Sequence, residues 1–210
     1  MPSEIVVLAG VNGAGKSSVA GAAFEAYGGT YYNPDLATRS YIEAGLSPIE
    51  ANSRAWRNGV EQLDQAIRLK TNYAFETTLG GRTVTRRLQE AAESGLRVRV
   101  WYVGLASPEK HIERVRARVL RGGHDIPEDR IRSRWTTSRE NLVRLLPSLY
   151  ELAVFDNTPE ARLDEGEIPS PVRLVHMKAR VLIDLAPPGA IASWARPIVA
   201  AALKLEQTGR

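Results

Sequence analysis

Short apolar runs alternate along the chain with longer segments in which apolar residues recur every three or four positions. The runs are rich in β-branched and aromatic residues, and most end in glycine, asparagine or an acidic residue. Such runs are typical of buried strands in a parallel sheet. The runs that predict strands are 4–10, 30–33, 72–76, 96–105 and 152–157.

The longer segments predict helices. Ser47-Pro48 and Ser107-Pro108 each place a capping serine before a proline suited to the first helical turn, and Gly95 ends another helical segment. Because strands and helices alternate, we expect an α/β fold: a mostly parallel, doubly wound sheet with flanking helices. Helices are expected over about 15–27, 47–70, 83–94, 107–120 and 127–150, with one more opening at Pro34.

The C-terminal part continues this pattern without a domain boundary. Residues 172–185 predict a hairpin with its bend near 176–179, and the apolar tail after residue 190 predicts a last helix. No repeat or low-complexity tract interrupts the chain. We therefore expect a single domain over residues 1–210, in which 160–210 supplies the hairpin and the final helix.

Composition excludes several classes of function. The 210 residues include no cysteine, and the three histidines are scattered, so disulfide scaffolds and zinc sites are not expected. The formal charge is 28 − 24 = +4, a mildly basic balance that suits a nucleotide and equally suits nucleic acid. The first residues lack a basic signal-peptide region and no apolar stretch reaches membrane length, so a cytoplasmic protein without membrane contact is expected.

The segment GVNGAGKS, residues 10–17, matches the phosphate-binding pattern G-x-x-x-x-G-K-[ST] between a predicted strand and a predicted helix. Its glycines let backbone N–H groups wrap around phosphate oxygens at the positive end of a helix. Lys16 would reach the β- and γ-phosphates, and the Ser17 hydroxyl would bind Mg²⁺. The expected ATP-binding residues are Gly10, Asn12, Gly13, Ala14, Gly15, Lys16, Ser17 and Ser18.

Two carboxylates follow predicted strands in positions that suit an acceptor site. Glu76 ends the run 72–76, and Asp35 follows the run 30–33. Ligands of parallel α/β sheets lie beyond the carboxyl ends of the strands, so both should emerge near the phosphate loop, where a carboxylate can orient an acceptor hydroxyl. A helix cap for Asp35 and a strand-end position for Glu76 are the structural alternatives. Asp156 ends a late strand, and a turn there is a better interpretation than a metal ligand.

Arginines at helical spacing lie on either side of Gly122-Gly123. A helical flap that carries them could neutralise the charge of a transferring phosphoryl group. A solvated basic face or a nucleic-acid footprint is the alternative, but few aromatic residues lie among them. The arginines are Arg114, Arg118 and Arg121 before the glycines and Arg130 and Arg134 after them.

These motifs in their order, GVNGAGKS, NPD, FETTLGGR and RGGHDIPEDRIRSR, resemble the zeta-toxin family of P-loop kinases, in particular its compact bacterial branch. The similarity covers about two thirds of the chain. It implies a P-loop NTPase fold with an arginine-bearing helical flap and ATP-dependent phosphorylation of UDP-N-acetylglucosamine at the 3′-hydroxyl of the amino sugar. It also allows an antitoxin protein as a partner.

The resemblance further implies roles for individual residues. Asp35 matches the general base, and Lys16 and Ser17 match the phosphate and metal positions. Arg121 and Arg134 match the pair that clamps the γ-phosphate, with Arg118 as an alternative to Arg121. The acceptor site would comprise Glu76, Thr77, Thr78 and Arg82.

The chain departs from the family pattern after about residue 160, where nothing matches a sugar or uridine site. Two alternatives therefore stay open beside the expected small-molecule acceptor. One is a P-loop kinase for a different hydroxyl, such as another nucleotide sugar, a metabolite or a nucleic-acid end. The other is an ATP-binding switch or adaptor that acts through its arginine-rich helices.

Overall fold

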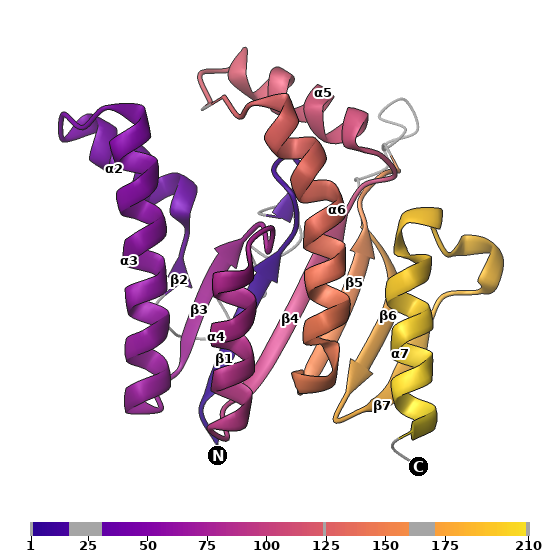
Figure 1. Ribbon diagram of the computed structural model, residues 1–210. Helices are drawn as coiled ribbons and strands as arrows, with labels where there is room; N and C mark the ends of the chain where they lie inside the picture. Colours follow the sequence, from indigo (N-terminus) through magenta and orange to yellow (C-terminus); the bar gives the residue numbers. More distant parts are fainter. Residues whose placement is uncertain (1, 17–30, 124, 160–170, 209–210) are drawn as a thin grey trace.

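The computed structural model of the protein describes residues 2–16, 31–123, 125–159 and 171–208. They form a seven-stranded sheet in the order β2-β3-β1-β4-β5-β6-β7 (Figure 1). The first five strands of the chain run parallel, whereas β6 and β7 are antiparallel to their neighbours. The strands are β1 (Glu4–Ala9), β2 (Tyr31–Tyr32), β3 (Tyr73–Thr77), β4 (Arg97–Gly104), β5 (Glu151–Asp156), β6 (Val172–Lys178) and β7 (Val181–Leu185).

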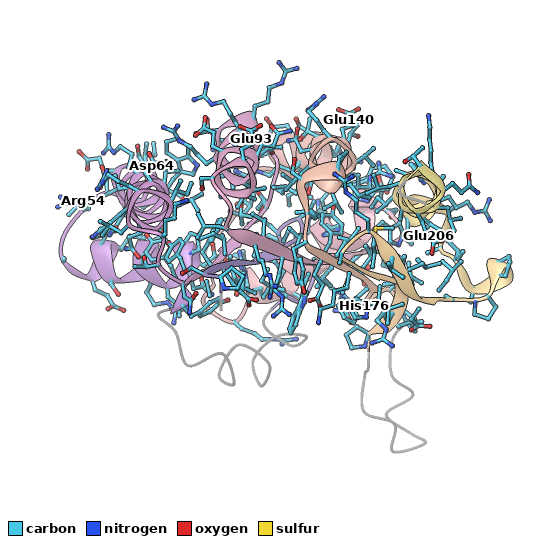
Figure 2. All side chains as sticks on the ribbon, turned by 90° about the horizontal axis from the view of Figure 1, so that it is seen from below. Arg54, Asp64, Glu93, Glu140, His176 and Glu206 are labelled. Atoms are coloured by element: carbon cyan, nitrogen blue, oxygen red, sulfur yellow. The ribbon has the colours of Figure 1, made fainter. Side chains whose placement is uncertain are left out.

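Helices cover one face of this sheet, as the view from below shows (Figure 2). They are α3 (Pro48–Leu69), α4 (Arg82–Glu93), α6 (Glu128–Leu145) and α7 (Arg196–Thr208). Two others lie beyond the carboxyl ends of the strands, at the top of Figure 1: α2 (Pro34–Glu43) and α5 (Pro108–Val119). The expected mostly parallel α/β sheet with flanking helices is thus confirmed.

Strand β1 is the middle one of the five parallel strands, and it is apolar on both faces. Ile5 and Val7 join the core beneath the four helices, and Val6 and Leu8 belong to a second cluster on the opposite face. From β1 the chain passes to β2 at the edge of the sheet and returns as β3 beside β1, then crosses to β4 and β5 on the other side. The point where the strand order reverses is where parallel sheets open a ligand crevice, so the topology places a site at the end of β1.

The helix starts follow local capping chemistry. Ser47 forms a full capping box with Glu50 at the start of α3, and Ser107 accepts from the Lys110 N–H at the start of α5. Asn33, rather than Asp35, caps α2. Serine followed by proline therefore predicted two helix starts correctly.

Some boundaries differ from the sequence-based expectation. Strand β6 continues through Lys178, so the hairpin bend lies at Ala179-Arg180, both with positive φ. Ala179 is the last residue of the expected stretch 176–179, and Arg180 lies one residue beyond it. The helix expected over 127–150 ends at Leu145 and continues as one 3-10 turn over Leu146–Ser148, where Pro147 removes a helical N–H. The helix expected over 15–27 lies almost wholly outside the described residues. Within the described part, none of the helices is both long and apolar enough to cross a membrane.

Candidate active site

The phosphate loop leaves β1 at Gly10, and only glycine suits that position. Its φ is +146°, and an added Cβ would lie 2.3 Å from the Val103 carbonyl oxygen. Gly13 and Gly15 also have positive φ, at +81° each. Lys16 folds back over the loop, and its ammonium donates to the Gly10 carbonyl oxygen at 3.0 Å. The loop thus has the backbone shape that its glycine spacing predicts.

Residues distant in the sequence hold this loop from outside. The His111 imidazole of α5 bonds the Asn12 carbonyl at 2.9 Å, and Asn157 after β5 donates to the Ala14 carbonyl at 2.9 Å. Arg114 in turn donates to the Asn157 carbonyl at 2.8 Å. Because a carbonyl only accepts, His111 must carry its proton on Nδ1. Burial lowers the pKa of His111 to about 4, so the imidazole is neutral.

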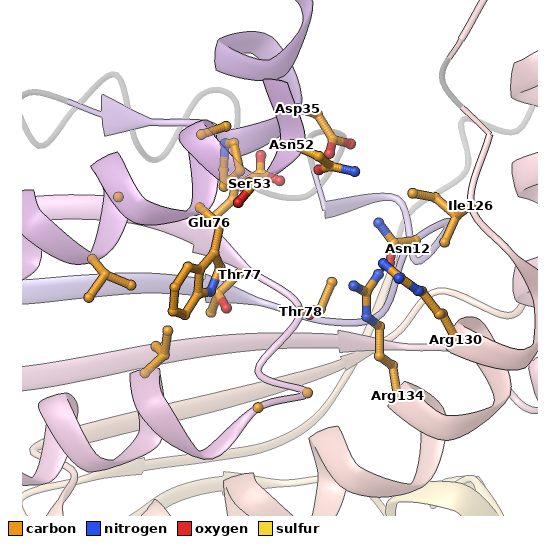
Figure 3. Close-up of a pocket in the computed structure, with 18 of the residues that line it drawn as sticks. Asn12, Asp35, Asn52, Ser53, Glu76, Thr77, Thr78, Ile126, Arg130 and Arg134 are labelled. Atoms are coloured by element: carbon orange, nitrogen blue, oxygen red, sulfur yellow. The ribbon is translucent and has the colours of Figure 1, made fainter. Parts of the chain in front are cut away.

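A cleft of about 1140 Å³ opens beside the phosphate loop, between α2 and α3 on one side and the turn after β3 and α6 on the other. Figure 3 shows Asp35, Asn52, Ser53 and Glu76 on one wall. Asn12, Arg130 and Arg134 form the opposite wall (Figure 3). We call these the acidic wall and the basic wall. The basic wall also carries Asp125 and Asp129 beside its two arginines, and Lys16 lines the same cleft.

Glu76 is the buried carboxylate of the acidic wall. It is 8% exposed, and its Oε1 accepts from the Tyr31 hydroxyl and from Asn33 Nδ2 at 3.1 Å. Its Oε2 lies 4.0 Å from the Lys16 ammonium. Burial, followed by the hydrogen bond to Glu76, raises the pKa of Tyr31, so Tyr31 stays a proton donor to the carboxylate. A carboxylate at the end of a buried strand is therefore compensated by hydrogen bonds and a cation.

Asp35 lies in the first turn of α2, at the mouth of the cleft, with its side chain 54% exposed. Its N–H bonds the Asn33 side chain at 2.9 Å, and its Oδ2 accepts from Arg118 of α5 at 3.1 Å. The first turn of a helix also favours a carboxylate there. Asp35 is thus accessible to a ligand and held by an arginine 83 positions away.

Arg134 extends from α6 to the phosphate loop, where it donates to Asn12 Oδ1 at 2.7 Å. Burial lowers the pKa of Arg134, and the charge of neighbouring Arg130 lowers it further. Gly80 makes room for this side chain, because a Cβ at that position would lie 2.8 Å from Arg134 Cγ. Asn12 therefore joins three elements: the loop, α5 through its carbonyl and α6 through its amide.

The structure brings together most of the residues expected in a site, but not all. Thr77 and Thr78 line the cleft, whereas Arg121 is exposed in the turn after α5 and is absent from the cleft lining in the described residues. Arg82 borders a separate hollow of about 440 Å³ with residues of α4 and Arg144. Ser17 and Ser18 lie outside the described residues.

Several contacts were missed by sequence reasoning. Tyr31, His111 and Asn157 had no motif that marked them, whereas Asn33 belongs to the quoted NPD segment and could have been noticed there. Arg114 was grouped with the arginines of the expected flap, and its bond to the Asn157 carbonyl was not foreseen. Asp156 has the turn role that was preferred for it: its Oδ1 accepts from the Thr158 N–H at 3.0 Å and from Trp194 at 3.2 Å.

Comparisons with known proteins agree with this architecture. The model of the AAA_33 family, described as an AAA domain, matches residues 5–145, more than half of the chain. An uncharacterized protein of Haemophilus influenzae is 28% identical over 142 residues, which are 64% of this chain and 94% of that protein.

Two solved structures have a similar fold. The AvrRxo1-ORF1:AvrRxo1-ORF2 complex with sulphate ions matches with a TM-score of 0.67 at 16% identity, over 96% of this chain and 64% of that one. The chain thus spans somewhat less than two thirds of that structure. The PezAT chromosomal toxin-antitoxin system of Streptococcus pneumoniae matches with a TM-score of 0.54 at 16% identity, over 99% of this chain and 87% of that one. At such identities the similarity establishes the P-loop α/β fold alone.

Proposed function

The chain belongs to the AAA_33 family of AAA domains, and we propose that it is a kinase that transfers the γ-phosphoryl group of ATP to a hydroxyl of a small molecule held in the cleft. One observation carries the proposal: the phosphate loop, two carboxylates and an arginine face one space at the reversal point of the sheet. A switch that only binds nucleotide has no need of a cleft of this size with an acidic wall.

Lys16 is proposed to hold the β- and γ-phosphates, and Arg134 to face the γ-phosphate from the basic wall. Phosphoryl transfer needs mainly positioning and neutralisation of charge on the transferring group, which these two cations supply. Because Arg134 already bonds Asn12 of the phosphate loop, it would meet the nucleotide where the loop binds it. Arg121 stays a proposed member of the clamp, and it would have to move into the cleft to act.

The fold implies Mg²⁺ with the ATP, and the described residues fit it. Among them no group of three or more His, Cys, Asp or Glu side chains comes together, but Mg²⁺ commonly uses one or two carboxylates with substrate phosphates and water. Ser17 is proposed as the hydroxyl ligand of the ion, with phosphate oxygens and water as its other ligands, while Glu76 is kept for the acceptor. The ion would neutralise charge on the phosphates.

Asp35 is proposed as the general base. It would take the proton of the acceptor hydroxyl as that oxygen bonds to the γ-phosphorus and the bond to ADP breaks. Arg118 holds the carboxylate toward the cleft from α5. Glu76, Thr77 and Thr78 would then bind the acceptor on the other side of the phosphate loop.

We further propose UDP-N-acetylglucosamine as the first acceptor to test, with phosphorylation at the 3′-hydroxyl of its amino sugar, as expected for the zeta-toxin branch. An antitoxin partner is proposed on the same ground. The fold similarity to the PezAT toxin-antitoxin system supports the proposed antitoxin partner. The proposed acceptor rests on the motif resemblance alone.

The test is a transfer assay with ATP and Mg²⁺, read by mass spectrometry on UDP-N-acetylglucosamine and a panel of other nucleotide sugars and polyols. We expect one acceptor to gain the mass of one phosphate with the wild type, and to lose that gain with Asp35→Asn. The matched control is Glu43→Gln, an exposed carboxylate at the other end of α2. ATP binding without transfer to any member would contradict the kinase and favour the nucleotide-dependent switch.

A further inference from the structure

A single amide side chain, that of Asn33, joins the two residues that carry the proposed acceptor-site carboxylates. Its Oδ1 accepts from the Asp35 N–H at 2.9 Å and from the Leu36 N–H at 3.2 Å. Its Nδ2 donates to Glu76 Oε1 at 3.1 Å. Because backbone N–H groups only donate, the amide oxygen must face α2 and the amide nitrogen must face Glu76.

On one side Asn33 determines where α2 begins. It is the N-cap of the helix, with extended backbone angles, and Pro34 follows in the first helical position, which its fixed φ suits. Asp35 comes next, and its own carboxylate is not needed as the cap. That carboxylate instead lies at the mouth of the cleft, where Arg118 donates to it at 3.1 Å.

On the other side Asn33 extends the pairing of β2 with β3. The two strands pair over two residues only, and the last pair is Tyr32 with Phe75. Asn33 and Glu76 follow directly, one on each strand, and their side chains form the next link between the strands. The Tyr32 hydroxyl also donates to the Ala55 carbonyl of α3 at 2.6 Å, which anchors the residue before Asn33.

The bond from Asn33 also orients the carboxylate of Glu76. Its Oε1 accepts from both Asn33 and the Tyr31 hydroxyl, whereas its Oε2 lies 4.0 Å from the Lys16 ammonium. Hydrogen bonds from surrounding residues are a general means of holding a functional side chain in one orientation. Figure 3 shows Asp35 and Glu76 on the same wall of the cleft.

We propose that Asn33 is a positioning residue that fixes Asp35 and Glu76 relative to each other, so that an acceptor bound at Glu76 presents its hydroxyl to Asp35. The inference rests on the proposed kinase function. The structural alternative is a plain helix cap, for which aspartate or serine would serve as well. Aspartate has no N–H to donate to Glu76, so it separates the two roles.

The kinetic experiment uses Asn33→Asp, which keeps the cap and the shape of the side chain but removes the donor. With the acceptor identified by the transfer assay, we expect kcat to fall about 10- to 100-fold, because small misplacements of reacting groups are costly. Affinity for a non-hydrolysable ATP analogue, measured by calorimetry, should change little. The matched control is Asn72→Asp, which should keep kcat: Asn72 precedes β3, and its Oδ1 also accepts a backbone N–H, that of Glu4 at 2.9 Å.

Unfolding temperatures test the link between Asn33 and Glu76 without turnover. Asn33→Asp should lower the unfolding temperature of the wild type by about 3–6 °C, because it sets two carboxylates against each other. The same change should lower that of the Glu76→Gln variant much less, since the glutamine amide carries no charge and can donate to the new carboxylate.

An equal loss in both backgrounds would show that Asn33 is not coupled to Glu76 and would overturn the inference. An unchanged kcat in Asn33→Asp would overturn it as well, and would leave the kinase in place. If the wild type phosphorylates no acceptor, the kinase is refuted together with the role of Asn33 in it. The two failures are therefore distinguishable.

Discussion

His111 links acid stability to the phosphate loop. The imidazole is 1% exposed beneath the loop and donates from Nδ1 to the Asn12 carbonyl at 2.9 Å. Burial is the main reason that its pKa falls from 6.5 to about 4, and nearby Lys16, Arg114 and Arg139 lower it further. The folded protein therefore keeps His111 neutral at pH values where the unfolded chain already binds a proton.

The sign and size of the effect follow from this difference in proton binding. Below pH 6.5 the unfolded state gains a proton at His111 that the folded state does not, so the free energy of unfolding decreases as the pH falls toward 4. The contribution of neutral His111 to stability is fully present above pH 6.5, the pKa of histidine in the unfolded chain. Because the pKa falls to about 4 in the folded protein, the free energy of unfolding should be about 2 kcal/mol smaller at pH 5 than at pH 7.

Urea unfolding of the wild type and of His111→Gln at pH 7, 6 and 5 measures this contribution. Glutamine can still donate to the Asn12 carbonyl but does not titrate, and all other groups cancel in the comparison. We expect the variant to start less stable at pH 7 and to lose about 2 kcal/mol less than the wild type on going to pH 5. If the free energy of unfolding fell by the same amount in both proteins between pH 7 and pH 5, a buried neutral histidine at this position would be refuted.

Two further predictions concern the acidic wall and the start of α3. Glu76→Gln should lower kcat/KM for the acceptor by about 10- to 100-fold, since it removes the charge that Tyr31, Asn33 and Lys16 surround. ATP affinity, measured by calorimetry, should change little. An equal loss of ATP affinity would show that Glu76 serves the metal or the fold. Ser47→Ala removes the capping box of α3 and should lower the free energy of unfolding by about 1 kcal/mol, whereas Ser47→Asp should keep most of it; an unchanged value in chemical denaturation would contradict the cap.

The central part of the fold could be predicted from the sequence because its signals are local. The glycines of 10–15 specify a loop with positive φ, and Ser47 with Pro48 specifies a helix start within a few residues. Apolar runs identified the five parallel strands and placed Glu76 at the end of one. The P-loop family followed from the same short motifs, and the match to residues 5–145 confirms it. The zeta-toxin branch and the acceptor stay predictions.

Only the tertiary structure decided how the site is held together. Asn12 meets Arg134 across 122 positions, and Asp35 meets Arg118 across 83. Such contacts depend on strand order and on where α5 and α6 lie over the sheet, which no local pattern encodes. For the same reason helical spacing gave Arg118 and Arg121 as alternatives, and the structure alone shows that Arg118 bonds Asp35 while Arg121 is exposed after the helix.

Trp56 is a second case in which the sequence pattern did not determine the position of a side chain. In the sequence it is one apolar residue among others at helical spacing in 47–70, and such residues normally form the core. The core-facing positions of α3 are instead occupied mostly by alanines, and the tryptophan lines the cleft. A hydrophobic pattern determines that a helix has an apolar side. Which neighbours cover that side, and which part stays open to a ligand, depends on the packing of distant elements.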